Sequence, residues 1–79
     1  MFGIKKKTEV RKIHLDRAMD EVSNLKRGES IIIYKPRGDM LSETFKRQVE
    51  SVAFRRSLMM LSEPETDDNG NFYVRLQKI

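Results

Sequence analysis

The segment Ser30-Ile31-Ile32-Ile33-Tyr34 decides the fold of this chain. Three consecutive β-branched residues followed by an aromatic residue are typical of a β-strand that is buried on at least one face. The next five residues, Lys35-Pro36-Arg37-Gly38-Asp39, predict a turn, because Pro36 fixes its own φ angle and Gly38 can adopt a positive one. We therefore expect a buried strand that ends at this turn.

A helix is predicted before this strand, starting at about His14. Apolar residues recur there at helical spacing and form one face. Lys26-Arg27 and then Gly28 fit the end of a helix, because cations favour its negative end and glycine suits the left-handed cap. The apolar face consists of Leu15, Ala18, Met19, Val22 and Leu25. Residues 1–13 do not continue the pattern, and we interpret them as a basic arm or a short strand.

A second helix is predicted after the strand, from about Met40 to Arg56, with Asp39 as its N-cap. Phe54 falls nearly opposite the apolar stripe of this helix, and Ser57 stands where a glycine commonly ends a helix. The stripe consists of Leu41, Phe45, Val49, Val52 and Ala53.

The C-terminal part of the chain predicts a hairpin. Leu58–Leu61 is one strand, and Pro64 ends it or confines it to an edge. The dipeptide Asn69-Gly70 favours a tight turn within a polar loop over 65–71, and residues 72–77 alternate between apolar and polar. The predicted fold is α+β, a three-stranded sheet with two helices in the order α-β-α-β-β. Residues 1–13 would be the arm and residues 14–79 a single domain.

Composition excludes several classes of function. A chain of 79 residues has room for one small domain and little room for a deep catalytic pocket. The absence of Cys excludes disulfides, thiol catalysis and cysteine-ligated metals, and one histidine, His14, cannot supply a catalytic triad by itself. No apolar segment resembles a membrane span or a signal peptide. We therefore expect a cytoplasmic, non-enzymatic protein that needs no cofactor or metal.

Charge points to a polyanionic partner. The chain has 16 Lys+Arg against 12 Asp+Glu, and eight of the basic residues lie in the first 27 positions with only four acidic ones. Such residues bind phosphates through charge and forked hydrogen bonds, which predicts binding to DNA or RNA by the arm and the second helix. A solvated surface and an acidic protein partner are the alternatives. The candidate residues are Lys5, Lys6, Lys7, Arg11, Lys12, Arg37, Lys46, Arg47, Arg55, Arg56 and Arg75.

Two tyrosines offer a second route to nucleic acid. Tyr34 and Tyr73 would stack bases if both stand on an exposed face of the sheet near Arg75. The alternative is that they border the core, with their hydroxyl groups in water.

The run Leu58-Met59-Met60-Leu61 places apolar side chains on both faces of one strand. Two helices easily cover only one face of a small sheet, so the other face or the strand edge would remain for a partner. This favours a homodimer or a protein interface. The alternative function is a protein-binding inhibitor or adaptor that acts on a host macromolecule.

The stretch from Leu25 to Ile79 resembles small uncharacterised proteins encoded by bacteriophages. The elements that carry the resemblance are residues 25–30 leading into the strand, the segment Ala53-Phe54-Arg55-Arg56, the turn Asp68-Asn69-Gly70 and the terminal Val74-Arg75-Leu76. The resemblance implies a compact α+β fold and a phage-type origin, hence the host cytoplasm, and it implies no known activity. The leading hypothesis is a regulatory protein that binds nucleic acid.

Overall fold

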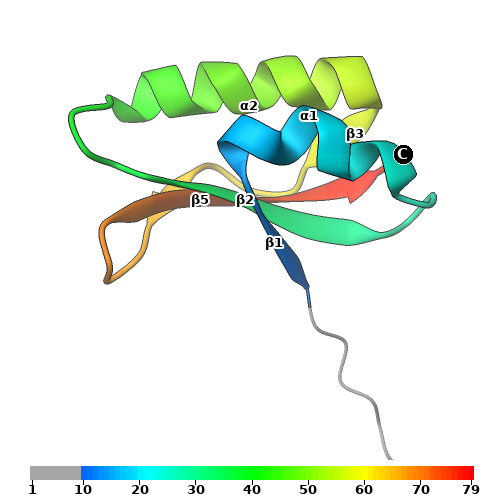
Figure 1. Ribbon diagram of the computed structural model, residues 1–79, viewed down its shortest axis with the longest axis horizontal. Coiled ribbons are helices and arrows are strands. Elements are labelled where there is room, and N and C mark those ends of the chain that lie inside the picture. The colour runs from blue at the N-terminus through cyan, green and yellow to red at the C-terminus, as the bar shows by residue number, and fades with distance from the viewer. Residues whose placement is uncertain (1–9) are drawn as a thin grey trace, which may run out of the picture.

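The computed structural model describes residues 10–79, which form an α+β fold with a mixed sheet (Figure 1). The helical parts are a first segment, made of η1 (Leu15–Arg17), α1 (Ala18–Glu21) and η2 (Val22–Asn24), and the long helix α2 (Ser42–Arg56). The strands are β1 (Arg11–His14), β2 (Ser30–Pro36), β3 (Leu58–Met60), β4 (Glu65–Thr66) and β5 (Asn71–Lys78). The predicted α+β class is therefore confirmed.

The sheet has the order β1-β2-β5-β3, with β4 also pairing with β5. Strands β1 and β2 are parallel, and β5 is antiparallel to β2, β3 and β4. The expectation of three strands was wrong, because β1 and β4 are additional. Both are too short to show alternation: β4 has two residues, and Ile13 is the only buried residue of β1. For Arg11–His14, the structure shows the short-strand alternative.

The core lies between one face of the sheet and the helices, which both cover that face (Figure 1). Ile31 and Ile33 of β2 are fully buried, as the β-branched run predicts. From the helix side, Phe45 packs against Phe72 of β5, with ring centroids 5.3 Å apart. The helices thus leave the opposite face of the sheet open within the described residues.

The first helical segment is less regular than predicted. A four-residue α-helix stands between two 3₁₀ turns, although Leu15, Ala18 and Val22 are buried as the apolar spacing indicates. His14 has a structural role at its start, since its Nδ1 accepts a hydrogen bond of 3.0 Å from the backbone N–H of Asp16. This bond satisfies a backbone N–H at the start of the helical segment.

Helix α2 begins at Ser42, two residues later than predicted. The N-cap position belongs to Leu41, which offers no side-chain hydrogen bond, and the predicted cap Asp39 stays in the preceding loop. That loop is closed by a bond of 2.8 Å from the N–H of Met40 to the carbonyl of Arg37. The helix ends at Arg56 as predicted, and its C-cap Ser57 adopts the left-handed conformation with φ 57° and ψ 54°.

Replacing Ser57 by glycine is expected to raise the free energy of unfolding by about 0.5–1 kcal/mol. A left-handed conformation costs a residue with a side chain roughly 1–2 kcal/mol, and the greater freedom of glycine in the unfolded chain offsets part of that gain. The matched control is Ser51→Gly, at an exposed position inside α2, which should instead lower stability by about 0.5 kcal/mol. Urea denaturation measures both; a destabilised Ser57→Gly variant would contradict the strain at this cap.

Candidate nucleic-acid interface

The uncovered face of the sheet presents its side chains in rows across the strands. One row consists of Lys12, Ile32 and Arg75, which are partners in the register of β1, β2 and β5. The neighbouring row contains Tyr34 and Tyr73, which are paired directly across β2 and β5. We call these five residues the open face. The structure therefore places both tyrosines and Arg75 together, as the stacking hypothesis requires.

The two tyrosines are held by different neighbours. The ring of Tyr34 meets that of His14 edge to face, with centroids 5.3 Å apart. The hydroxyl of Tyr73 donates a hydrogen bond of 2.8 Å to Oε1 of Glu65 in β4. This bond and the negative charge of Glu65 raise the pKa of Tyr73 above its ordinary 10.0, because both favour the neutral phenol. Both residues are half-buried, so part of each side chain remains accessible.

A hollow of about 310 Å³ lies beside the tyrosine pair. Tyr34, Tyr73, Ile32 and Lys12 line it from the sheet, and Asn69 of the β4–β5 turn and Asn71 at the start of β5 complete this lining. It therefore combines aromatic rings with amide groups and one cation, a lining that suits a planar polar group.

Asp67 also borders this hollow, but its carboxylate holds the β4–β5 turn. Its Oδ1 accepts bonds of 2.9 Å from the backbone N–H groups of Asn69 and Asn71, and its Oδ2 accepts one of 3.3 Å from Nδ2 of Asn71. The bond from the Asn71 backbone, followed by the others, lowers the pKa of Asp67 below its ordinary 3.8. The carboxylate is thus ionised at neutral pH and engaged in shaping the turn.

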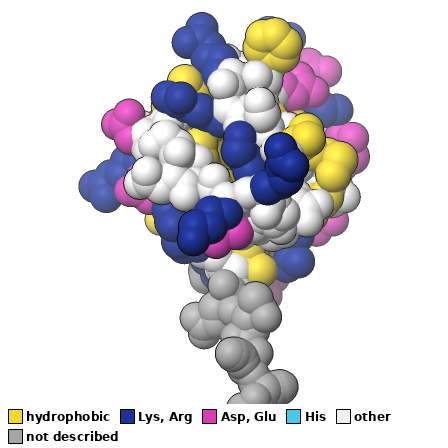
Figure 2. All heavy atoms as spheres, turned by 90° about the vertical axis from the view of Figure 1, so that its right-hand side faces the viewer, with side chains coloured by type: hydrophobic (Ala, Val, Ile, Leu, Met, Phe, Trp, Pro, Cys, Tyr) yellow, Lys and Arg dark blue, Asp and Glu magenta, His cyan; other side chains and the backbone are white. Residues whose placement is uncertain are grey.

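A second group of basic residues gathers at one end of the molecule. Three segments meet there: the N–H of Gly28 donates to the carbonyl of Lys78, the N–H of Lys78 to that of Glu29, and Nζ of Lys78 to the carbonyl of Arg56. Figure 2 looks onto this end and shows many Lys and Arg side chains, with acidic ones mainly at its periphery. We call Lys26, Arg27, Arg55, Arg56 and Lys78 the basic end.

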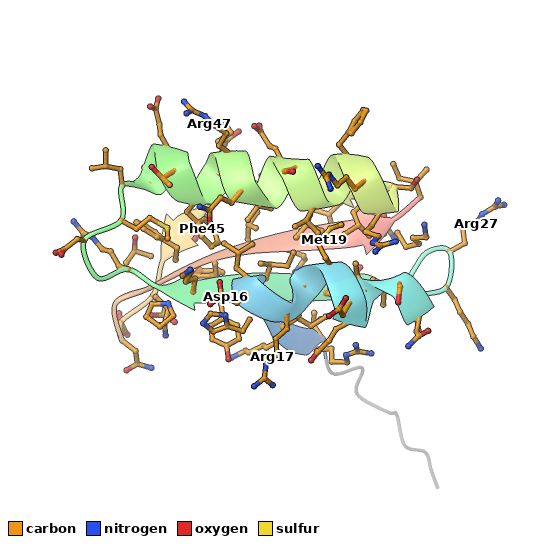
Figure 3. The ribbon with its side chains drawn as sticks, turned by 45° about the horizontal axis from the view of Figure 1, so that its top comes forward. Asp16, Arg17, Met19, Arg27, Phe45 and Arg47 are labelled. Carbon is orange, nitrogen blue, oxygen red and sulfur yellow. The ribbon has the colours of Figure 1, made fainter. Side chains whose placement is uncertain are left out.

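The basic residues that were predicted to bind nucleic acid lie in several separate places in the structure. Arg55 and Arg56 belong to the basic end, and Lys12 and Arg75 to the open face. Arg47 projects from the outer side of α2, on the opposite side of the sheet from the open face (Figures 1 and 3). Lys5, Lys6 and Lys7 lie outside the described residues.

Three further members of that set have partners within the domain. Nη2 of Arg11 donates to the carbonyl of Glu21 at 3.2 Å. The guanidinium of Arg37 lies 6.0 Å from the ring centre of Phe72. Nζ of Lys46 pairs with Glu63 at 2.9 Å, and this hydrogen bond raises the pKa of Lys46. These contacts account for the three side chains without nucleic acid.

Sequence reasoning missed Lys26, Arg27 and Lys78 as members of a site. In the sequence, Lys26 and Arg27 fit the C-terminal turn of a helix, where basic residues are favourable without any binding partner. The sequence does show two consecutive basic residues directly before Gly28. Only the strand order, however, brings Lys78 to the same end of the molecule.

Half of the predicted interface segment Leu58–Leu61 belongs to the core. Leu58 is buried and Met60 packs against the core, whereas Met59 and Leu61 are 46% and 43% exposed. The backbone N–H of Leu61 continues the pairing with β5 by donating 2.8 Å to the carbonyl of Arg75. Two of the four residues are thus accessible, beside the edge strand β3.

Residues 10–79 hold no cluster of three potential metal-ligating side chains, and none of their helices is long and apolar enough to cross a membrane. Comparisons with protein-family models, curated proteins and solved structures find nothing that matches this chain.

Proposed function

We propose that this protein is a small regulatory protein that binds nucleic acid and holds its phosphate backbone at the basic end. The observation that carries the proposal is the meeting of five Lys and Arg residues from three segments that are far apart in the sequence. The turn that carries Lys26 and Arg27 also contains the acidic residue Glu29. Its carboxylate is already engaged, because Oε1 accepts a bond of 2.8 Å from the N–H of Lys26. Lys26, Arg27 and Arg55 are exposed and available to an external anion, whereas Nζ of Lys78 already donates to the carbonyl of Arg56.

Salt dependence tests this proposal. Fluorescence anisotropy with labelled DNA and RNA, single-stranded and duplex, should show binding at about 50 mM salt that weakens strongly by about 200 mM. If all five residues contact phosphates, the slope of log K against log salt should be about −3.5 for single strands or about −4.5 for duplex DNA. Failure of all four nucleic acids to bind at low salt would disprove the proposal.

The edge strand β3 favours a second candidate function, binding to a protein or to a second copy of the chain. Met59 and Leu61 expose apolar surface beside a strand whose outer edge has no partner within the described residues. Retention of a protein partner at high salt, abolished by Met59→Lys with Leu61→Lys, would support this candidate. Retention that is sensitive to nuclease would support nucleic acid.

A further inference from the structure

We infer that the open face binds unpaired bases, so that the ligand of this protein is single-stranded nucleic acid with bases stacked on Tyr34 and Tyr73. The inference rests on the proposed function and names the form of nucleic acid. Its starting point is the face of the sheet that neither helical segment covers. Aromatic side chains on such a face are a common means of holding single strands.

The register brings the necessary groups within reach of a few nucleotides. Side chains paired across antiparallel strands stand about 5 Å apart, so the two tyrosines are direct neighbours on this face. Lys12 and Arg75 occupy the next row, about 7 Å along the strands, and flank Ile32 from the two neighbouring strands. The stacking groups and the phosphate-binding groups thus lie in two adjacent rows on one face.

The distribution of charge indicates which path the phosphate backbone of a bound strand would take across the protein. Glu65 of β4 is the register partner of Tyr73 and extends the tyrosine row, and Asp67 lines the same hollow as the two rings, so phosphates would be repelled from that side. On the other side of that row, a second hollow of about 590 Å³ is lined by both Arg75 and Gly28. It joins the open face to the turn that carries Lys26 and Arg27. A strand held at the basic end therefore reaches the tyrosines by way of Arg75.

A duplex does not fit this arrangement, because its bases are stacked on one another and their faces are inaccessible to tyrosine rings. The hollow beside Tyr34 and Tyr73 is instead bordered by Asn69, whose side-chain amide can hydrogen-bond to the edge of a base that lies on the rings.

The chain offers an intrinsic probe, since it has two tyrosines and no tryptophan. Tyrosine fluorescence should be quenched on titration with a single-stranded oligo(dT), and a duplex of the same length should quench it far less. Tyr34→Leu and Tyr73→Leu should each weaken binding of the single strand by about 5- to 150-fold, the value of one stacked base. Leucine keeps an apolar side chain on the sheet, and circular dichroism verifies that each variant folds.

The matched controls separate stacking from other effects. Tyr34→Phe and Tyr73→Phe retain the rings and should retain affinity, although the second loses its bond to Glu65. Phe54→Leu removes an exposed aromatic ring on α2 and should leave affinity unchanged. Equal binding of duplex and single strand, with no loss in the Tyr→Leu variants, would overturn the inference and leave the proposed function standing. Absence of any binding at low salt would overturn both.

Discussion

Replacing Phe45 by alanine is expected to lower the free energy of unfolding by about 3–5 kcal/mol. Phe45 is fully buried between α2 and the sheet, where its ring packs against Phe72 (Figure 3). The substitution removes apolar surface from the core and leaves a cavity that the sheet and helix can close only in part. A domain of this length has a total stability of about 4–12 kcal/mol, so the substitution should remove at least about a quarter of it and lower the urea midpoint clearly.

The control for this prediction lies on the same helix. Phe54 is 89% exposed, and Phe54→Ala should change stability by no more than about 0.5 kcal/mol. Urea denaturation followed by circular dichroism measures both variants against the original chain. Equal losses in the two variants, or a loss below about 1 kcal/mol for Phe45→Ala, would show that α2 does not pack on the sheet through this ring.

The difference between these two phenylalanines could be predicted from helical spacing alone. Phe45 shares its stripe with Val49 and Val52, and all three are buried, whereas Phe54 lies opposite. The prediction that Leu41 belongs to the same buried stripe was wrong. Leu41 is 71% exposed, because the helix begins only after it. Periodicity therefore identifies the buried face of a helix well and its first turn poorly, since the start depends on the conformation of the preceding loop.

The candidate site was less accessible to sequence reasoning, because it depends on contacts between distant segments. Alternation places Tyr73 opposite to the buried side chains of its strand, but it does not identify Tyr34 as the direct partner of Tyr73. That pairing follows from the register of β2 and β5. The parallel pairing of β1 with β2 likewise sets Lys12 in the row of Arg75. No local pattern encodes these registers, because they result from burying both strands against the same helices.

Reversing two charges at the basic end should weaken nucleic-acid binding by about 100-fold. The variant is Arg27→Glu with Arg55→Glu, chosen because both side chains are exposed and Arg27 extends away from the body of the domain (Figure 3). Each charged hydrogen bond to a phosphate is worth about tenfold in affinity, and the acidic replacements add repulsion. The salt slope should also fall by about two, one for each phosphate that the variant no longer neutralises. Arg56 is left unchanged because it is half-buried.

A second double variant, Arg17→Glu with Arg47→Glu, is the matched control. Each reversal removes two units of charge, so both double variants lower the net charge from +4 to about zero. Arg17 and Arg47 are exposed and lie on η1 and the outer side of α2, away from the basic end (Figure 3). If the net charge of the whole molecule attracted the nucleic acid, the two double variants would lose the same affinity. That result would contradict a localised site. A localised site requires that the control retain its salt slope, because the basic end still neutralises the same phosphates.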